Sequence, residues 1–319
     1  MLFLGTTIDG LQMGLCFAVL ALGVYISYSI LDFPDLSVDG TFPLGGVCCT
    51  IFMLRLGLPP LLAVFFSFFV GMLAGTVTGL LHVRFRISKL LSGIIVMTAL
   101  LSVNLALTKL LTQNGYTTTI FSYRSESLEG LFDNTFLERW LGEGTKDYAI
   151  LIILILIVVV LKIIVDLFLK TKMGYLLRAT GDNEKLVVSL GRDAGTYKIL
   201  GIAIANGFTA VSGALYAQLY TQYDNTSGSG KVVQALASVI IGLAVFSGLR
   251  FMKGTTSVIF GSVFYSLCLN YLVLVDSDGI YLKLWNAVMF MLILIFNGKI
   301  SAFLSRRSRA EKKGGLPHA

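Results

Sequence analysis

Repeated apolar runs of about 20 residues constrain this chain more than any other feature of its sequence. A helix of that length crosses roughly 30 Å of hydrocarbon. Charged residues make up only 13% of the chain, whereas hydrophobic residues make up 55%. The sequence therefore predicts an all-α, polytopic transmembrane helical bundle of about nine spans, with membrane lipid around it. We expect the spans at residues 10–31, 37–54, 58–82, 89–111, 148–169, 197–219, 232–249, 255–275 and 284–304.

Basic residues gather in short segments between the apolar runs, and this pattern predicts the orientation of the chain. Since such residues concentrate in cytoplasmic loops, we expect a multi-pass membrane protein with its C-terminus in the cytoplasm. The net charge of +7 follows from this pattern and does not indicate nucleic acid. The predicted parts are a transmembrane domain (1–305) with an external loop (about 112–147) and a cytoplasmic segment (about 170–196), then a basic cytoplasmic tail (306–319).

The stretch DFPDLSVDGTFPLGG at 32–46 interrupts the apolar pattern between the first two runs. Its prolines and glycines predict a broken or re-entrant helix, whose freed backbone groups must face protein or a water-filled cavity. No His, Cys or matching carboxylate elsewhere completes a metal or catalytic site. We expect Asp32 and Asp35 to be cap and turn residues near the cytoplasmic surface. Asp39 and Thr41 are candidates for the translocation pathway.

Several neutral amides lie within otherwise apolar runs. Such side chains most often form hydrogen bonds between helices, and that interpretation suits Gln218, Asn270 and Asn286. Asn104 and Asn206 fall near the middle of their predicted spans, so we predict that they line the pathway.

Two further patterns within the spans indicate packing rather than chemistry. Lys162, Asp166 and Lys170 are spaced at i, i+4 and i+8, which predicts an ion-pair ladder along one helix face. The sequence GMLAGTVTG at 71–79 contains two overlapping GxxxG steps, which permit close contact between helices.

The segment DNTSGSGK at 224–231 superficially resembles a phosphate-binding loop. It lacks the first glycine of that motif, and Val232 follows the lysine where serine or threonine belongs. We interpret it as a flexible external turn. The chain shows no ATPase motif, no nucleophile elbow and no metal-ligand spacing, so we expect no catalytic residues, no metal and no cofactor bound by the chain itself.

The predicted cytoplasmic segment about 170–196 is unusually long and patterned. Asp182 or Thr180 could cap a short helix, and Gly191 suits a helix stop. Such an amphipathic helix either docks into a cleft on a partner ATPase or lies against lipid headgroups, and the spacing favours neither. The residues that would make the ATPase contact are Arg178, Asp182, Asn183, Glu184, Lys185 and Gly191.

The region 173–218 resembles the coupling segment and following span of permeases of the branched-chain amino acid family of ABC importers. The resemblance rests on the motifs Met173–Gly174, Arg178–Ala179, Asp182–Glu184, Leu190–Gly191 and Ala210–Leu215. The order of spans, the long external loop and the basic tail are similar too. The stretch 32–40 departs from the Asn-Phe-Ala-His-Gly-like break of amino-acid members. It resembles instead a branch with members assigned to tryptophan or tyrosine uptake.

This resemblance implies a transmembrane permease subunit of a bacterial plasma (inner) membrane, which imports a small solute, such as an amino acid, by alternating access. It implies a separate ABC ATPase that uses ATP and Mg²⁺, an extracytoplasmic substrate-binding protein or lipoprotein, and a second permease copy. The alternatives are an ion- or proton-coupled secondary transporter, which would want a paired acid or base deep in a span, and a membrane scaffold without a substrate.

Overall fold

The computed structural model describes residues 2–111, 119–120, 130–132, 146–246, 252–275, 281 and 283–295. Within these residues the chain is almost entirely helical, and seven helices are long and apolar enough to cross a membrane. Two shorter apolar helices, Val38–Leu54 and Lys283–Ile295, lie where two further spans were predicted. The prediction of a polytopic helical membrane protein is confirmed. Most of the predicted external loop and the whole basic tail lie outside the described residues.

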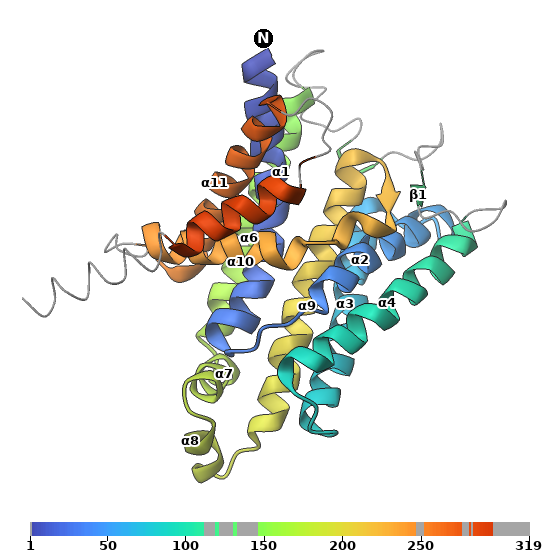
Figure 1. The fold of residues 1–319 in the computed structure, drawn as a ribbon. Helices are drawn as coiled ribbons and strands as arrows, with labels where there is room; N and C mark the ends of the chain where they lie inside the picture. The colour runs from blue at the N-terminus through green and yellow to red at the C-terminus, as the bar shows by residue number, and fades with distance from the viewer. Residues whose placement is uncertain are drawn as a thin grey trace, which may run out of the picture.

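The first half of the chain contains a long helix, a break and then three more helices (Figure 1). The break falls at residues 31–37 and is narrower than predicted. Helix α2 runs through Pro43, Gly45 and Gly46 without interruption. The elements are α1 (Leu2–Val24), the π-helical turn η1 (Tyr25–Ile30), α2 (Val38–Leu54), α3 (Pro60–Val83) and α4 (Lys89–Leu111).

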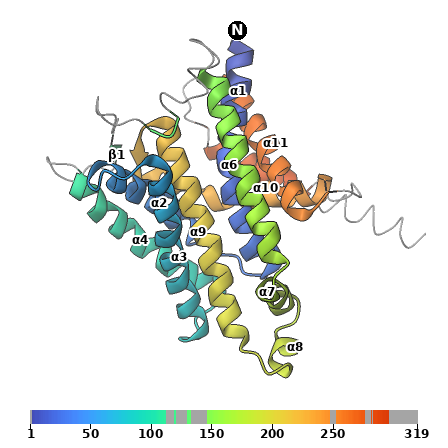
Figure 2. The ribbon, with the colours of Figure 1, turned by 180° about the vertical axis from the view of Figure 1, so that it is seen from behind.

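The second half begins with a helix that spans the molecule. Two short helices follow it at the lower edge (Figures 1 and 2). Figure 2 shows this helix, α6, running beside α1, with α7 and α8 beyond its end. The remaining elements are α6 (Lys146–Leu169), α7 (Lys172–Asp182), α8 (Glu184–Ser189), α9 (Ala194–Tyr220), the 3₁₀ turn η2 (Asn225–Gly228), α10 (Lys231–Ile241), the π-helical turn η3 (Gly242–Phe246) and α11 (Gly254–Val275).

The order of a long, a short and a long helix occurs twice, in α1–α2–α3 and in α9–α10–α11. Helix α3 packs on α9 and α11 packs on α1, so each half exchanges a helix with the other. Helices α1 and α9 run in opposite directions (Figure 1), which makes the two halves inverted relative to each other.

Glycines hold the helices of the two halves in close contact. A Cβ atom at Gly75 would lie 2.5 Å from the Ile202 carbonyl oxygen, and one at Gly79 would lie 2.8 Å from the Ile199 Cα. The predicted packing role of GMLAGTVTG is therefore confirmed. Gly45 of α2 approaches the Ala210 backbone of α9 in the same way, which explains why this glycine belongs to an unbroken helix.

A short pair of strands and an ion-pair cluster complete the described contacts. Strand β1 (Thr119–Ile120) pairs antiparallel with β2 (Tyr223–Asp224).

The Asp166 carboxylate lies 3.3 Å from Lys162, as the predicted ion-pair ladder requires. Its second cation is Lys253 at 3.1 Å rather than Lys170. The pair thus links α6 to the start of α11.

Candidate functional site

A buried polar cluster joins the break at residues 31–37 to the middle of α9. Asn206 donates from Nδ2 to the Asp35 carboxylate at 2.7 Å and to the Ile202 carbonyl at 3.1 Å. Its Oδ1 accepts from the hydroxyls of Ser37 at 3.2 Å and Thr41 at 2.7 Å. All four hydrogen-bonding positions of the amide are therefore used.

This cluster corrects the prediction for Asp35. The carboxylate does accept the Ser37 N–H, at 2.8 Å, as a turn residue should. It is nevertheless 5% exposed and contacts α9, because the break folds into the protein rather than along its surface. Asp32 is the exposed residue of the two, and it pairs with Lys89 at 3.1 Å.

Asp39 and Asn104 fix the start of α2 against its neighbours. The Asp39 carboxylate accepts the N–H groups of Gly230 at 3.0 Å and Val232 at 2.8 Å, so it caps α10 from another helix. Asn104 of α4 donates to the Gly40 carbonyl at 3.0 Å. The four predicted pathway residues, Asp39, Thr41, Asn104 and Asn206, thus surround the N-terminal turn of α2. That they line a pathway stays a prediction.

Replacing Asp39 with alanine should destabilise the protein by about 2 kcal/mol, because two N–H groups at the start of α10 lose their acceptor. Asp39→Asn keeps one amide oxygen, so its effect should be intermediate. The thermal unfolding midpoint of the purified protein measures both effects. An unchanged midpoint for Asp39→Ala would show that water replaces the carboxylate at no cost.

The connection from α9 to α10 is an ordered part of this region, not the flexible external turn that we expected from DNTSGSGK. The Asp224 carboxylate accepts the N–H of Thr226 at 2.9 Å, which forms the η2 turn. Gly228 is buried against the carbonyl of Asp39. Pro43 has no N–H to donate to that carbonyl, so α2 leaves room for the connecting segment at this point.

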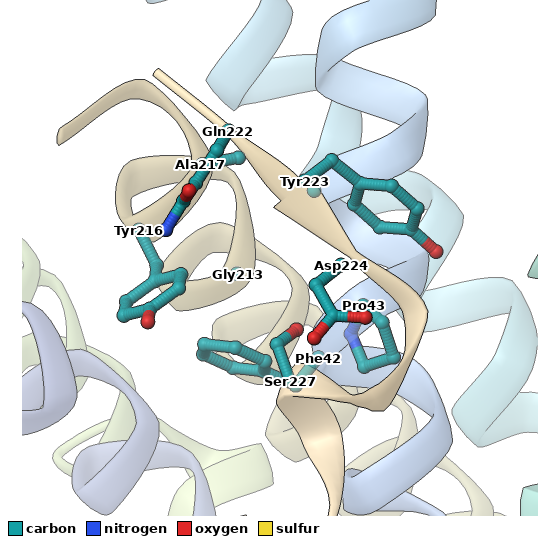
Figure 3. A pocket seen from close by; sticks show the side chains of 10 residues that line it. Phe42, Pro43, Gly213, Tyr216, Ala217, Gln222, Tyr223, Asp224 and Ser227 are labelled. Atoms are coloured by element: carbon teal, nitrogen blue, oxygen red, sulfur yellow. The ribbon is translucent and has the colours of Figure 1, made fainter. Parts of the chain in front are cut away.

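A small pocket lies between this connection and the facing turns of α2 and α9 (Figure 3). Its space of about 10 Å³ holds about one water molecule. In Figure 3 the Asp224 carboxylate points toward Ser227 and Phe42, whereas the Tyr223 ring points away from Tyr216. The lining residues are Phe42, Pro43, Gly46, Gly213, Tyr216, Ala217, Gln222, Tyr223, Asp224 and Ser227. None of the four predicted pathway residues is among them.

The other predicted amides form hydrogen bonds between elements, as expected. Gln218 donates to the Pro60 carbonyl at 3.2 Å and accepts the Leu131 N–H at 3.1 Å. Asn286 accepts the hydroxyl of Tyr265, and Asn270 donates weakly to the Met13 sulfur at 3.9 Å. These residues therefore hold the bundle together.

The predicted coupling segment forms two exposed helices at one end of the molecule, α7 and α8 (Figure 1). Asn183 caps α8 by accepting the Leu186 N–H at 3.3 Å, which corrects the expectation of Asp182 or Thr180 as the cap. Helix α7 runs through Asp182, so that residue lies before the turn. Gly191 adopts φ +71° just after α8, as a helix stop requires. All six predicted coupling residues are exposed.

The coupling segment is tied to α9 at two points. Glu184 pairs with Lys198 of α9 at 2.6 Å. Asp193 caps α9, and hydrogen bonds from the Thr196 hydroxyl and the Gly195 N–H lower the pKa of its carboxyl. The stabilisation from this cap is therefore present above the unfolded pKa and is lost as the pH falls through the folded pKa.

Helix α7 also contacts the turn that precedes the break. Gly181 lies directly against the Ile30 carbonyl, and the fully buried Leu177 packs beside Gly201 of α9. Ile30 is the last residue of η1, and the buried Asp35 follows five residues later. The exposed segment is thus connected through packed atoms to the polar cluster in the interior.

Comparison with known proteins gives matches over most of the chain. The family described as branched-chain amino acid transport system / permease component matches residues 6–297. The tyrosine transport system permease protein of Clostridioides difficile (strain R20291) is 37% identical over 90% of this chain and 90% of its own. An uncharacterized protein of Rickettsia prowazekii (strain Madrid E) is 31% identical over 87% of this chain and 92% of its own. The autoinducer 2 import system permease protein LsrC of Salmonella paratyphi B (strain ATCC BAA-1250 / SPB7) is 27% identical over 46% of this chain and 42% of its own. No solved structure was found to match.

Proposed function

The chain belongs to the family of permease components of branched-chain amino acid transport systems, and from this membership we propose its partners, its cargo and how it is driven. It is the transmembrane permease subunit of an ABC importer of small solutes. This conclusion replaces the secondary-transporter alternative. We propose that two copies of the permease work with a separate ATPase that uses ATP and Mg²⁺, and with an extracytoplasmic binding protein that delivers the solute.

We propose an amino acid as the cargo, with an aromatic one as the first candidate. The support is the similarity to a protein named as a tyrosine transport system permease over nine-tenths of both chains. The departure of residues 32–40 from the break of other amino-acid members agrees with this choice. Uptake of labelled amino acids by cells that express the complete transporter measures the cargo directly.

The observation that best supports the ATP-driven mechanism is the pair α7–α8. It exposes three apolar side chains, Leu186, Val188 and Leu190, with Val188 59% and Leu190 63% exposed. Exposed apolar side chains beside charged residues suit a protein cleft, because a helix that stayed in water would be more polar. The contact of α7 with the end of η1 offers a route by which closure of the ATPase moves the break and the polar cluster. Alternating access would follow from rocking of the two inverted halves.

We expect Val188→Asp and Leu190→Asp together to abolish ATPase docking. The carboxylates would have to lose water inside the cleft, while the free permease should fold normally because both side chains are exposed. Recovery of the ATPase with affinity-purified permease should fall at least tenfold. Leu56→Asp is the matched control, since Leu56 is also 63% exposed but connects α2 to α3 at the other end of the molecule. Full recovery of the ATPase with the double variant would exclude α8 as the docking helix.

Substitutions at Val188 and Leu190 test ATPase docking more specifically than substitutions at Glu184 or Gly191, two of the coupling residues that the sequence predicts. Glu184 holds α8 to Lys198, and any side chain at Gly191 would be strained at its positive φ. Either change would disturb the local fold as well as the docking surface.

A further inference from the structure

A lysine lies among three aromatic rings at the point where α1, α2, α9 and α10 meet. Lys231 is the first residue of α10, and its Nζ lies 4.0 Å from the ring centroid of Phe17. The centroids of Phe42 and Tyr216 lie 5.5 Å from the same atom. The rings also contact one another, with centroids 5.6 to 6.0 Å apart. All three are within about 6 Å, the distance at which aromatic faces attract a cation. We call Lys231 together with Phe17, Phe42 and Tyr216 the cage.

This lysine has no carboxylate partner among the residues that the structure describes. Within the described part of the chain, no acidic oxygen lies within 4.0 Å of Nζ, and the nearby Asp39 carboxylate accepts backbone N–H groups instead. Lys231 donates to Gln234 Oε1 at 3.3 Å. Gln234 is 4% exposed, and its buried Nε2 has no acceptor among the residues that the structure places. Two neighbouring donors, one of them charged, thus lack an anionic acceptor, and both cost free energy in that state.

The position of this pair fits a cargo site. Phe17 and Phe42 come from one inverted half, and Tyr216 and Lys231 come from the other. Transporters built from inverted halves bind cargo between them, with the N-termini of broken helices toward anionic groups. Phe42 and Tyr216 also line the pocket of Figure 3, so the lysine and the pocket share two rings.

We propose that Lys231 and Gln234 bind the carboxylate of an amino-acid cargo, while Phe42 and Tyr216 contact the rest of the molecule. The proposal rests on the proposed function, because it concerns the cargo of the same pathway. A carboxylate would give Gln234 Nε2 its acceptor and would give Lys231 an anionic hydrogen-bond acceptor. Since the pocket holds only about one water molecule, the cargo enters when the segment 222–227 moves away from α2 and α9.

The competing explanation is structural: the lysine holds α10 against the three rings and binds nothing. The variant Gln234→Glu separates the two explanations. A carboxylate at 234, one turn from Lys231, pairs with the lysine and occupies the place of the cargo carboxylate. Uptake should fall at least tenfold. A purely structural lysine would be better satisfied by the new partner, so uptake would stay at or above the wild-type rate.

The experiment measures ATP-dependent uptake of each of the twenty L-amino acids, radiolabelled, in cells that express the complete transporter. Lys231→Met should lower uptake at least tenfold and Lys231→Arg less than threefold, because arginine keeps the charge. ATP hydrolysis by the purified permease–ATPase complex should stay within twofold of wild type for each variant. Lys253→Met, which removes an exposed lysine outside the cage, is the control.

Two results would overturn the proposal. If Gln234→Glu or Lys231→Met transports like wild type, or if hydrolysis falls together with uptake, then the cage is structural while the proposed function stands. If the wild-type complex takes up none of the twenty amino acids, the proposed cargo class is wrong, and the carboxylate site fails with it.

Discussion

Replacing Gly75 with leucine is expected to remove the folded permease from the membrane. A Cβ atom at this position would lie 2.5 Å from the Ile202 carbonyl oxygen and 2.8 Å from the Ala203 Cα. Both are backbone atoms of α9, so no side chain can rotate away and α3 must separate from α9. Overpacking typically destabilises a protein by about 1–3 kcal/mol. A leucine against backbone atoms should reach or exceed the upper value, because the backbone cannot move aside. Small residues at such contacts are what allow helices to associate in lipid.

The yield of monodisperse permease–ATPase complex and its Tm measure this effect. Gly75→Ala adds a single methyl group at the same place and should give an intermediate loss. Val77→Leu is the control on the same helix, because Val77 is 49% exposed and enlarging it meets no protein. A wild-type yield and Tm for Gly75→Leu would contradict the described contact of α3 with α9.

The apolar pattern predicts most of this fold because lipid leaves few alternatives to long helices. Helix α3 was expected at 58–82 and is found at Pro60–Val83, and α9 was expected at 197–219 and is found at Ala194–Tyr220. The break in 32–46 was predicted with the wrong extent. Pro43 lies in the second turn of α2 and has no N–H to donate to the Asp39 carbonyl. Gly228, in the connection between α9 and α10, packs against that carbonyl instead. That compensation depends on a residue far away in the sequence.

The candidate site was harder to predict, because its contacts join residues that are distant in the chain. Asn206 stood out as an amide in an apolar run, yet nothing near it indicated Asp35 as its partner. Lys231 was hidden in a segment that resembled a flexible loop. The signal that could have found it is a lysine that starts an apolar helix, since a charge within a membrane protein needs a partner. Its partners, Phe17 and Tyr216, look like ordinary core residues in sequence.

The polar cluster and the cage meet at the start of α2. Thr41 binds Asn206, Asp39 caps α10, and Phe42 contacts Lys231. About one turn of α2, residues 39–42, thus connects the break, α9 and α10. A movement of the break, transmitted from α7 through Ile30, would reach the proposed cargo site without any further element. This is why the cluster should matter for transport as well as for stability.

Replacing Asn206 with leucine is expected to destabilise the protein by about 3 kcal/mol, the upper range for leaving buried polar groups without their hydrogen-bond partner. The Asp35 carboxylate would lose the donor at 2.7 Å, and the hydroxyls of Ser37 and Thr41 would lose their shared acceptor. Asn206→Asp should be equally harmful, because it places a second carboxylate against the first. The Tm of the purified protein measures both variants.

The exchange of the two residues, Asp35→Asn with Asn206→Asp, distinguishes a specific pair from a general need for polarity. The new carboxylate at 206 would accept from both hydroxyls and from the amide at 35, and only the bond to the Ile202 carbonyl would be lost. We therefore expect the exchange to recover at least half of the Tm lost by Asn206→Asp alone. If the double variant is no more stable than that single variant, the two side chains do not act as a pair. Recovery of the Tm without recovery of uptake would show that the break requires its carboxylate at position 35 itself.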